Sequence, residues 1–217
     1  MSKVIEERRK KTLFLTQFSL LLAIEAIVCF TPLGSIPIGP LVATLSHVPV
    51  IITAITLGTG AGALMGFFFG LFSFIVNSFV TPNLFSFVFT PLYNGGNLWS
   101  LVICFVPRVL IGVTAGLVFS GLHSLLKHKP TDAVSYVASA IVGTLTNTVL
   151  VLGGIYLFFG KTYAEAMAES TPGFTYDMLL GAMMTVVGTN GVLELVIAVI
   201  VAFAVCAPIR KYLLELD

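Results

Sequence analysis

Long apolar stretches separated by short polar breaks are the feature that most limits what this chain can fold into. The 217 residues are 57% hydrophobic and only 10% charged, whereas soluble domains carry about 25% charged residues. About 20 apolar residues are enough to cross the hydrocarbon core of a bilayer. The sequence therefore predicts a multi-pass protein of the cell membrane. Its apolar segments cover residues 12–30, 47–57, 61–80, 99–126, 133–160 and 187–208.

The distribution of basic residues predicts which ends of these segments face the cytoplasm. Nine of the eleven Lys and Arg residues fall in three short clusters. Basic residues that flank membrane spans favour the cytoplasmic side, so all three clusters and both termini are expected there. The clusters are Lys3 to Lys11, Lys127 with Lys129, and Arg210 with Lys211.

The stretch 47–80 is long for one span and short for two. With the first span leaving the membrane near Phe30 and the fourth entering it near Asn97, the chain must cross an even number of times between them. We therefore expect two helices that turn inside near Gly58, the short one accommodated by tilt or by burial within the bundle. The predicted fold is all-α, a single domain over residues 1–217 with six transmembrane helices and both termini cytoplasmic.

Three linkers then lie outside the membrane, at residues 31–46, 81–96 and 161–187. The first is rich in Pro and Gly, so it cannot form a regular helix. The first two contain no charged residue, which favours loops that fold over the bundle as a lid. The third carries several charges and looks more solvated. An outward-facing substrate pocket capped by loops is the resulting expectation.

Arg108 is the one basic residue inside an apolar segment. A charge at membrane depth is costly unless it is paired or lines a wet cavity, so Arg108 is a candidate for binding an anionic ligand. The alternative is that Arg108 pairs with Glu25 or Glu194 and braces the bundle. Glu25, Arg108 and Glu194 all lie within about 15 Å of the outer ends of their spans, at 1.5 Å per residue.

Several other polar residues complete the candidate substrate-binding set. Glu25 and Glu194 are candidates, but two carboxylates would repel an anion, which favours structural partners or loop tethers. Asn147 lies near the middle of its span, where an amide suits either a neighbouring helix or a polar substrate. The remaining candidates are Asn190, one turn before Glu194, and Tyr93 and Asn94 in the second outer linker.

The sequence supports neither catalysis nor cofactor chemistry. It has no metalloprotease, serine-hydrolase or phosphate-binding motif, so any work driven by ATP requires a partner. The Cys and His residues lack the spacing of metal ligands, and the three cysteines lie in apolar segments. No basic stripe is present for nucleic acid. We expect no enzyme, no metal and no cofactor.

Small residues suggest two further contact surfaces. Ser19 and Ala23 are four residues apart in the first span, a spacing that lets helices approach closely. Five glycines between Gly58 and Gly70 form a stronger small-residue face, and Gly58 and Gly62 are its candidates for contact with a partner. The alternative for these glycines is packing inside the bundle.

Two motifs in this chain resemble those of a known family. They are Leu57-Gly-Thr-Gly-Ala-Gly-Ala-Leu-Met-Gly-Phe67 and Val106-Pro-Arg-Val-Leu-Ile-Gly-Val-Thr-Ala-Gly-Leu117, and they follow the loop sequences Pro37-Ile-Gly-Pro40 and His47-Val-Pro-Val50. With six spans in about 200 residues, the chain resembles the S components, or substrate-binding membrane subunits, of energy-coupling factor (ECF) vitamin transporters. The pantothenate-type members are the most similar.

The resemblance implies a high-affinity binding subunit of an ATP-driven vitamin importer. It implies a vitamin site near the outer face under the first, third and fifth loops. It implies as partners a transmembrane coupling subunit, docked on the small-residue motif of the first helix, and two cytoplasmic ATPases. That motif is Ser19 and Ala23 here, a departure from the usual Ala pair. For pantothenate, Arg108 would take the carboxylate and Asn147 the amide or hydroxyls.

Other functions remain open at this point. Another vitamin is one alternative: folate, biotin, niacin, pyridoxine, riboflavin or cobalamin. A self-sufficient secondary transporter or channel is a second, although no convincing repeat relates residues 1–96 to 97–217, as inverted halves would require. A structural membrane subunit is a third alternative. The uncharged loops over an ionisable pocket argue against it.

Overall fold

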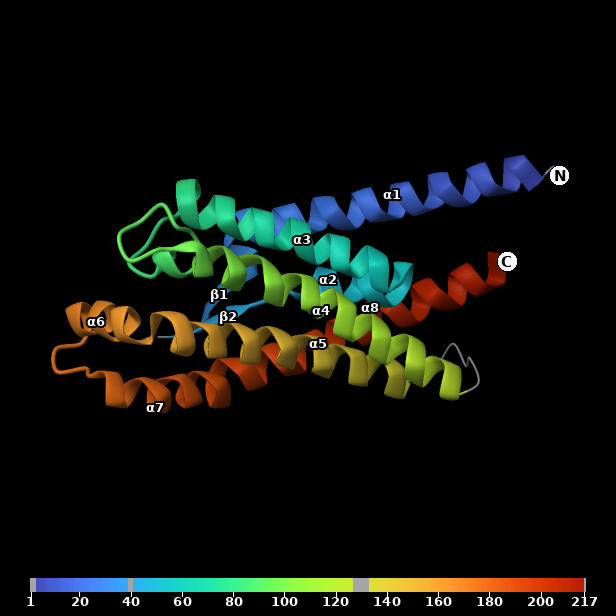
Figure 1. Cartoon of the computed structure of the whole chain (residues 1–217). Helices are drawn as coiled ribbons and strands as arrows, with labels where there is room; N and C mark the ends of the chain where they lie inside the picture. The colour runs from blue at the N-terminus through green and yellow to red at the C-terminus, as the bar shows by residue number, and fades with distance from the viewer. Residues whose placement is uncertain (1–2, 39–40, 127–132, 217) are drawn as a thin grey trace.

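The computed structural model describes residues 3–38, 41–126 and 133–216. The described chain is almost wholly helical (Figure 1). Its α-helices are α1 (Lys3–Phe30), α2 (Val48–Leu57), α3 (Thr59–Ile75), α4 (Leu98–Leu125), α5 (Ala133–Gly154), α6 (Gly160–Ser170), α7 (Tyr176–Val186) and α8 (Val192–Leu216).

Five continuous helical stretches in the described chain are long and apolar enough to cross a membrane. They are Ile5–Phe30, Thr59–Val80, Leu98–Leu125, Ala133–Ser170 and Tyr176–Arg210. The predicted all-α integral membrane protein is therefore confirmed. The predicted segment 47–57 forms α2, an apolar helix of only 10 residues.

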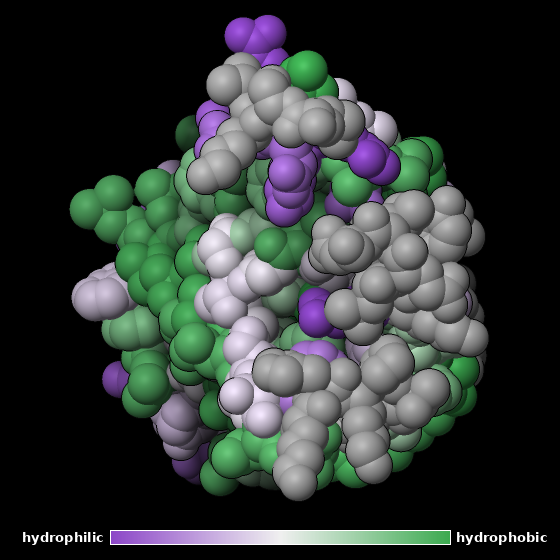
Figure 2. Space-filling model, turned by 90° about the vertical axis from the view of Figure 1, so that its right-hand side faces the viewer, coloured by the Kyte–Doolittle hydropathy of each residue, from purple (hydrophilic) through white to green (hydrophobic). Residues whose placement is uncertain are grey.

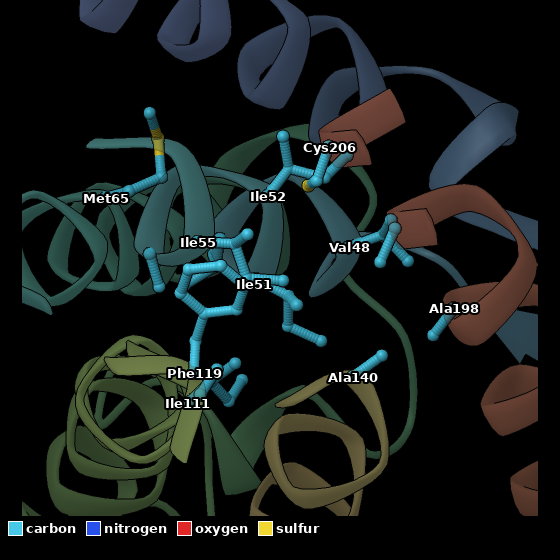
Figure 3. Packing of buried hydrophobic residues seen from close by; sticks show 14 of the residues in the cluster. Val48, Ile51, Ile52, Ile55, Met65, Ile111, Phe119, Ala140, Ala198 and Cys206 are labelled. Atoms are coloured by element: carbon cyan, nitrogen blue, oxygen red, sulfur yellow. The ribbon is translucent and has the colours of Figure 1, made fainter. Parts of the chain in front are cut away.

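α2 can be short because other helices surround it. It contacts α1, α3, α4, α5 and α8, and Val50, Ile51 and Ile55 are at most 1% exposed. Buried residues of these helices form one hydrophobic cluster around α2. Figure 3 shows Ile51 and Ile55 in the middle of this cluster, with Phe119 of α4 pointing toward them. The turn predicted near Gly58 is present, since α2 ends at Leu57 and α3 begins at Thr59. Gly58 adopts φ +98° there, a conformation that favours glycine.

The last turn of α2 is held by the far end of the chain. The guanidinium Nη1 of Arg210 donates to the carbonyl oxygen of Ile55 at 3.0 Å and lies over the ring of Phe119, 4.8 Å from its centre. The final carbonyls of a helix have no partner within the helix, and a cation there also complements the helix dipole. Arg210 thus caps α2 from α8.

The glycines of α3 pack against α4 within this chain. A Cβ added to Gly66 would overlap the carbonyl oxygen of Arg108, and one added to Gly62 would meet Ala54 at 2.5 Å and the carbonyl oxygen of Gly112 at 3.1 Å. Gly62 is buried in this helix contact, not on a face open to a partner. The close contact fixes the position of α4, the helix that carries Arg108.

The first linker is as predicted, whereas the third linker differs from the expectation. The first linker contains an antiparallel hairpin of β1 (Ser35–Ile38) and β2 (Leu41–Thr44), with Ser35 opposite Thr44. This agrees with the prediction that it does not form a regular helix. The linker 161–187, expected as a solvated loop, is mostly helical, as α6 and α7. Its Ala-, Glu- and Met-rich composition favours helix. The break between the two helices covers residues 171–175, where Gly173 has φ +88°.

π-helical turns join α5 to α6 (Ile155–Phe159) and α7 to α8 (Val187–Gly191). The stretch Ala133–Ser170 has 38 residues, or about 57 Å of helix at 1.5 Å per residue. This is far longer than a hydrocarbon core of about 30 Å. The stretch is therefore longer than one crossing needs, and its last part, α6, pairs with α7 at the left of Figure 1.

The start of α1, the end of α4, the start of α5 and the end of α8 lie at one end of the molecule, at the right of Figure 1. We call it the basic end, because it carries the cations of α1 from Arg8 to Lys11 and Arg210 of α8. Figure 2 looks onto this end and shows hydrophilic side chains there beside hydrophobic flanks. The cluster at Lys127 and Lys129, and the loop residues Gly39 and Pro40, lie outside the described residues.

Candidate functional site

Two adjoining cavities lie among the helices and the hairpin. The larger, of about 290 Å³, is called the Arg108 cavity. The smaller, of about 160 Å³, is called the Glu194 cavity. Thr44, Asn147 and Val151 line both. The Arg108 cavity is also lined by Cys29, Ser46, Phe69, Ser73, Val76, Asn77, Phe89 and Arg108. The Glu194 cavity is also lined by Thr148, Leu152, Val186, Val187, Asn190, Gly191 and Glu194.

Arg108 is held in its cavity by a local feature of α4. Pro107 has no N–H, so it leaves the carbonyl of Ile103, four residues earlier, without its helical partner. Nη1 of Arg108 donates to this carbonyl oxygen at 3.0 Å. The bond directs the guanidinium back toward the start of α4, away from the basic end. The pair Pro107-Arg108 is thus a single device that fixes the cation.

Arg108 lies against aromatic rings and forms no ion pair with any acid of the described chain. Its guanidinium carbon lies 5.3 Å from the ring centre of Phe69 and 5.1 Å from that of Phe89. The side chain is only 6% exposed, and Nε has no hydrogen-bond partner. Among the side chains that the structure describes, no carboxylate lies within 4.0 Å of Arg108. A buried cation with open donors is suited to an anionic ligand.

Asn147 of α5 stands where the two cavities meet. It is half-buried, and its Oδ1 has no hydrogen-bond partner in the described chain. An amide carbonyl in this state is an acceptor for an N–H or O–H group of a ligand. The acceptor Oδ1 of Asn147 and the unpaired donor Nε of Arg108 thus belong to residues that line the same cavity.

The two acids have local partners. Glu194 Oε1 accepts a hydrogen bond from the backbone N–H of Thr44 at 2.6 Å, so Glu194 tethers the end of β2 over the cavities. Glu25 is fully buried, and its Oε1 accepts from the Cys29 thiol at 3.3 Å. Cys29 lines the Arg108 cavity, which places Glu25 immediately behind that wall.

The cavities bring together four of the predicted site residues: Arg108, Asn147, Asn190 and Glu194. Tyr93 and Asn94 line neither cavity. Both are exposed, and the Tyr93 hydroxyl donates to the carbonyl oxygen of Ser78 at 2.7 Å, in the π-helical turn that ends the stretch Thr59–Val80.

Sequence reasoning missed several lining residues. Asn77 could have been found, because it is an amide within an apolar stretch, the same signal that marks Asn147. Ser73 and Thr44 gave no such signal. Phe69 and Phe89 are two of 18 phenylalanines, and only the fold distinguishes them from the others. His47 lies beside the site and joins α2 to α5 through a 3.1 Å hydrogen bond between its Nε2 and Thr144 Oγ1.

The candidate partner-contact residues differ in their surroundings. Ser19 and Ala23 are exposed on α1, so this pair of small residues faces away from the rest of the chain. Gly58 is half-buried, and no atom lies within 4 Å of a Cβ added there. Gly62, in contrast, belongs to the α3–α4 contact.

A buried cation that lines an interior cavity of a helical membrane protein is suited to the binding of a small anionic solute. The chain belongs more specifically to the family described as ECF transporter, substrate-specific component, whose model matches residues 13–206. Members are transporter subunits, not enzymes, and work within a complex with other subunits. The chain is thus a multi-pass protein of the cell membrane.

Two relatives cover most of the chain. The "Pantothenic acid transporter PanT" of Lactococcus lactis subsp. cremoris (strain MG1363) is 37% identical over 177 residues, which is 79% of this chain and 80% of the relative. The "Pantothenate transporter PanT" of Leuconostoc mesenteroides subsp. mesenteroides is 26% identical over 206 residues, 90% of this chain and 91% of the relative.

Proposed function

We propose that this chain is the high-affinity substrate-binding subunit of an ATP-driven vitamin importer, that its substrate is pantothenate, and that Arg108 binds the carboxylate. The observation that carries the proposal is the buried guanidinium of Arg108, which lines the larger cavity and has no described carboxylate within 4.0 Å. A guanidinium fork matches a carboxylate with two parallel hydrogen bonds. The names of the two relatives support pantothenate as the substrate.

The cavities also suit the rest of this molecule. Pantothenate carries its carboxylate at one end, an amide in the middle and two hydroxyls at the other end. With the carboxylate at Arg108, the amide N–H would meet the open Oδ1 of Asn147, which lines the same cavity. The two cavities together fall in the range of about 300–1,000 Å³ that is typical of small-molecule sites.

The proposal includes six crossings with both termini in the cytoplasm. The cations of α1 and α8 share one end of the bundle (Figure 1), which supports a cytoplasmic basic end. α2 then counts as the second crossing, in spite of its length, because helices rather than lipid surround it. The cavities, on the side toward which Arg108 is directed, open outward under the hairpin.

Cysteine labelling tests this topology. A cysteine at Asn83 should react with a membrane-impermeant maleimide added to intact cells, and a cysteine at Thr59 should react only after permeabilisation. The native cysteines are replaced first, and a cysteine at Arg9 marks the inner side. Reaction at Thr59 from outside would overturn the six-span arrangement.

The energy for transport comes from partners in this proposal, a transmembrane coupling subunit and two cytoplasmic ATPases. The sequence has no phosphate-binding loop of its own. The exposed face of α1 that carries Ser19 and Ala23 is the proposed contact with the coupling subunit, because small residues let two helices approach closely. Gly58, near the basic end, is a second proposed contact.

The purified chain should bind pantothenate but should not transport it without its partners. In detergent, pantothenate should raise the thermal unfolding temperature of the chain alone, because a ligand that binds only the folded state stabilises it. In liposomes the chain alone should not concentrate pantothenate. A thermal shift with folate, biotin or niacin but not pantothenate would assign another vitamin. Concentrative uptake by the chain alone under an ion gradient would identify a secondary transporter instead.

A further inference from the structure

The two adjoining cavities are lined by side chains of opposite charge. Arg108 lines only the larger cavity and Glu194 lines only the smaller one. Uncharged groups line both, among them Asn147 and Thr44. None of the residues that line the Glu194 cavity is basic. A ligand that occupies both cavities therefore meets a cation at one end, an amide in the middle and an acid at the other end.

We propose that the Glu194 cavity holds the hydroxyl-bearing end of the substrate, and that Glu194 excludes ligands with a second negative group at that end. This inference rests on the proposed function, because it takes pantothenate as the ligand and Arg108 as the site of its carboxylate. It assigns Glu194 to specificity in addition to its contact with the hairpin.

The position of Glu194 is fixed well enough for this selection. The hydrogen bond from Thr44 N to Glu194 Oε1 holds the carboxylate against the hairpin, and the side chain is only 8% exposed. A carboxylate accepts hydrogen bonds, so it can receive the O–H of an alcohol. A phosphate at this position would place a second negative charge beside the Glu194 carboxylate, and no basic residue lines the cavity to neutralise it.

Charge is an efficient basis for this selectivity. Like charges placed together in a buried site destabilise a complex strongly, and specificity often depends on such repulsion against the wrong ligand. The Asn190 amide and the Thr148 hydroxyl, which line the same cavity, are compatible with hydroxyls and do not compensate a phosphate. The site should thus distinguish pantothenate from its phosphate monoester at the terminal hydroxyl.

Glu194→Gln is the matched variant. Glutamine keeps a side-chain oxygen that can accept from Thr44 N, while the negative charge is removed. The dissociation constants of pantothenate and of its terminal phosphate monoester are measured for the detergent-purified wild type and variant. We expect wild type to prefer pantothenate by on the order of 100-fold or more. We expect Glu194→Gln to reduce this ratio at least about tenfold, mainly by tighter binding of the ester.

Glu169→Gln is the control. Glu169 is exposed on α6 and lines neither cavity, so its removal changes the net charge of the protein without changing the site. The ratio should stay at the wild-type value. An equal change in both variants would show that the effect comes from overall charge and would overturn the proposal.

A ligand-side measurement on wild type remains informative even if Glu194→Gln does not fold. An analogue with an ammonium group in place of the terminal hydroxyl should bind within about tenfold of pantothenate, because Glu194 can pair with it. If the phosphate ester binds as tightly as pantothenate, the proposal is wrong while the proposed function stands. If pantothenate itself does not bind wild type, the proposed function fails first.

Discussion

Replacing Arg108 with alanine should weaken pantothenate binding by about 2–5 kcal/mol, the range for breaking a buried charged pair. The guanidinium is buried and has no described acid beside it, so the carboxylate of the ligand would lose its counter-ion. Arg108→Lys should also weaken binding markedly, because a point charge cannot reproduce two parallel hydrogen bonds. Isothermal titration calorimetry of the purified variants measures both effects. Arg9→Ala, which removes an exposed cation of α1, is the matched control and should bind like wild type.

A double cycle of residue and ligand separates a ligand clamp from a structural brace. Pantothenol replaces the carboxylate with a hydroxyl, so it should bind wild type much less tightly than the acid does. On Arg108→Ala the two ligands should bind almost equally, because the partner charge is already gone. Such non-additivity isolates the pair. Equal discrimination by wild type and Arg108→Ala would assign Arg108 to bracing the bundle.

Replacing Ala23 with tryptophan should abolish energised uptake and leave pantothenate binding intact. Ala23 is exposed on α1 and lines neither cavity, so a large ring there should separate the proposed helix contact with the coupling subunit without reaching the substrate. Uptake is measured in cells or liposomes that contain the complete complex, and binding is measured on the purified chain.

Leu117→Trp provides the comparison for Ala23→Trp. Leu117 is 60% exposed on α4, so a larger apolar side chain there adds bulk without touching the α1 face. This variant should retain uptake. If Ala23→Trp transports at the wild-type rate, the coupling subunit docks elsewhere on the chain. If both variants lose uptake equally, the loss does not identify a contact.

The periodic spacing of polar breaks predicted the helices well but not their ends. The hydrophobic effect marks where apolar residues are, and it placed the turn at Gly58 correctly. It does not mark where a helix stops once the chain leaves the bilayer. α6 and α7 continue because their residues favour helix on their own, and only the Thr171-Pro172-Gly173 region interrupts them. Intrinsic propensity, rather than hydropathy, decides the structure there.

The sequence could predict those site residues whose position depends only on their depth in a membrane span. Counting residues from the outer ends of the spans put Arg108 and Glu194 at similar levels, and both line the adjoining cavities. Thr44 could not be found in this way, because its position depends on a hairpin and on a hydrogen bond to a residue 150 positions later. The loop residues Tyr93 and Asn94 were candidates by composition, but they line neither cavity, and the Tyr93 hydroxyl bonds instead to the Ser78 carbonyl at the end of the α3 stretch.

The bond between Arg210 and Ile55 has a practical consequence for anyone who expresses this protein. The last residues of a membrane chain are a common place to shorten a gene or attach an affinity tag. Here a stop codon before Arg210 would remove the group that satisfies the Ile55 carbonyl at the end of the most buried helix. A cleavable tag is therefore better attached at the amino-terminal side, where residues 5–16 of α1 are exposed.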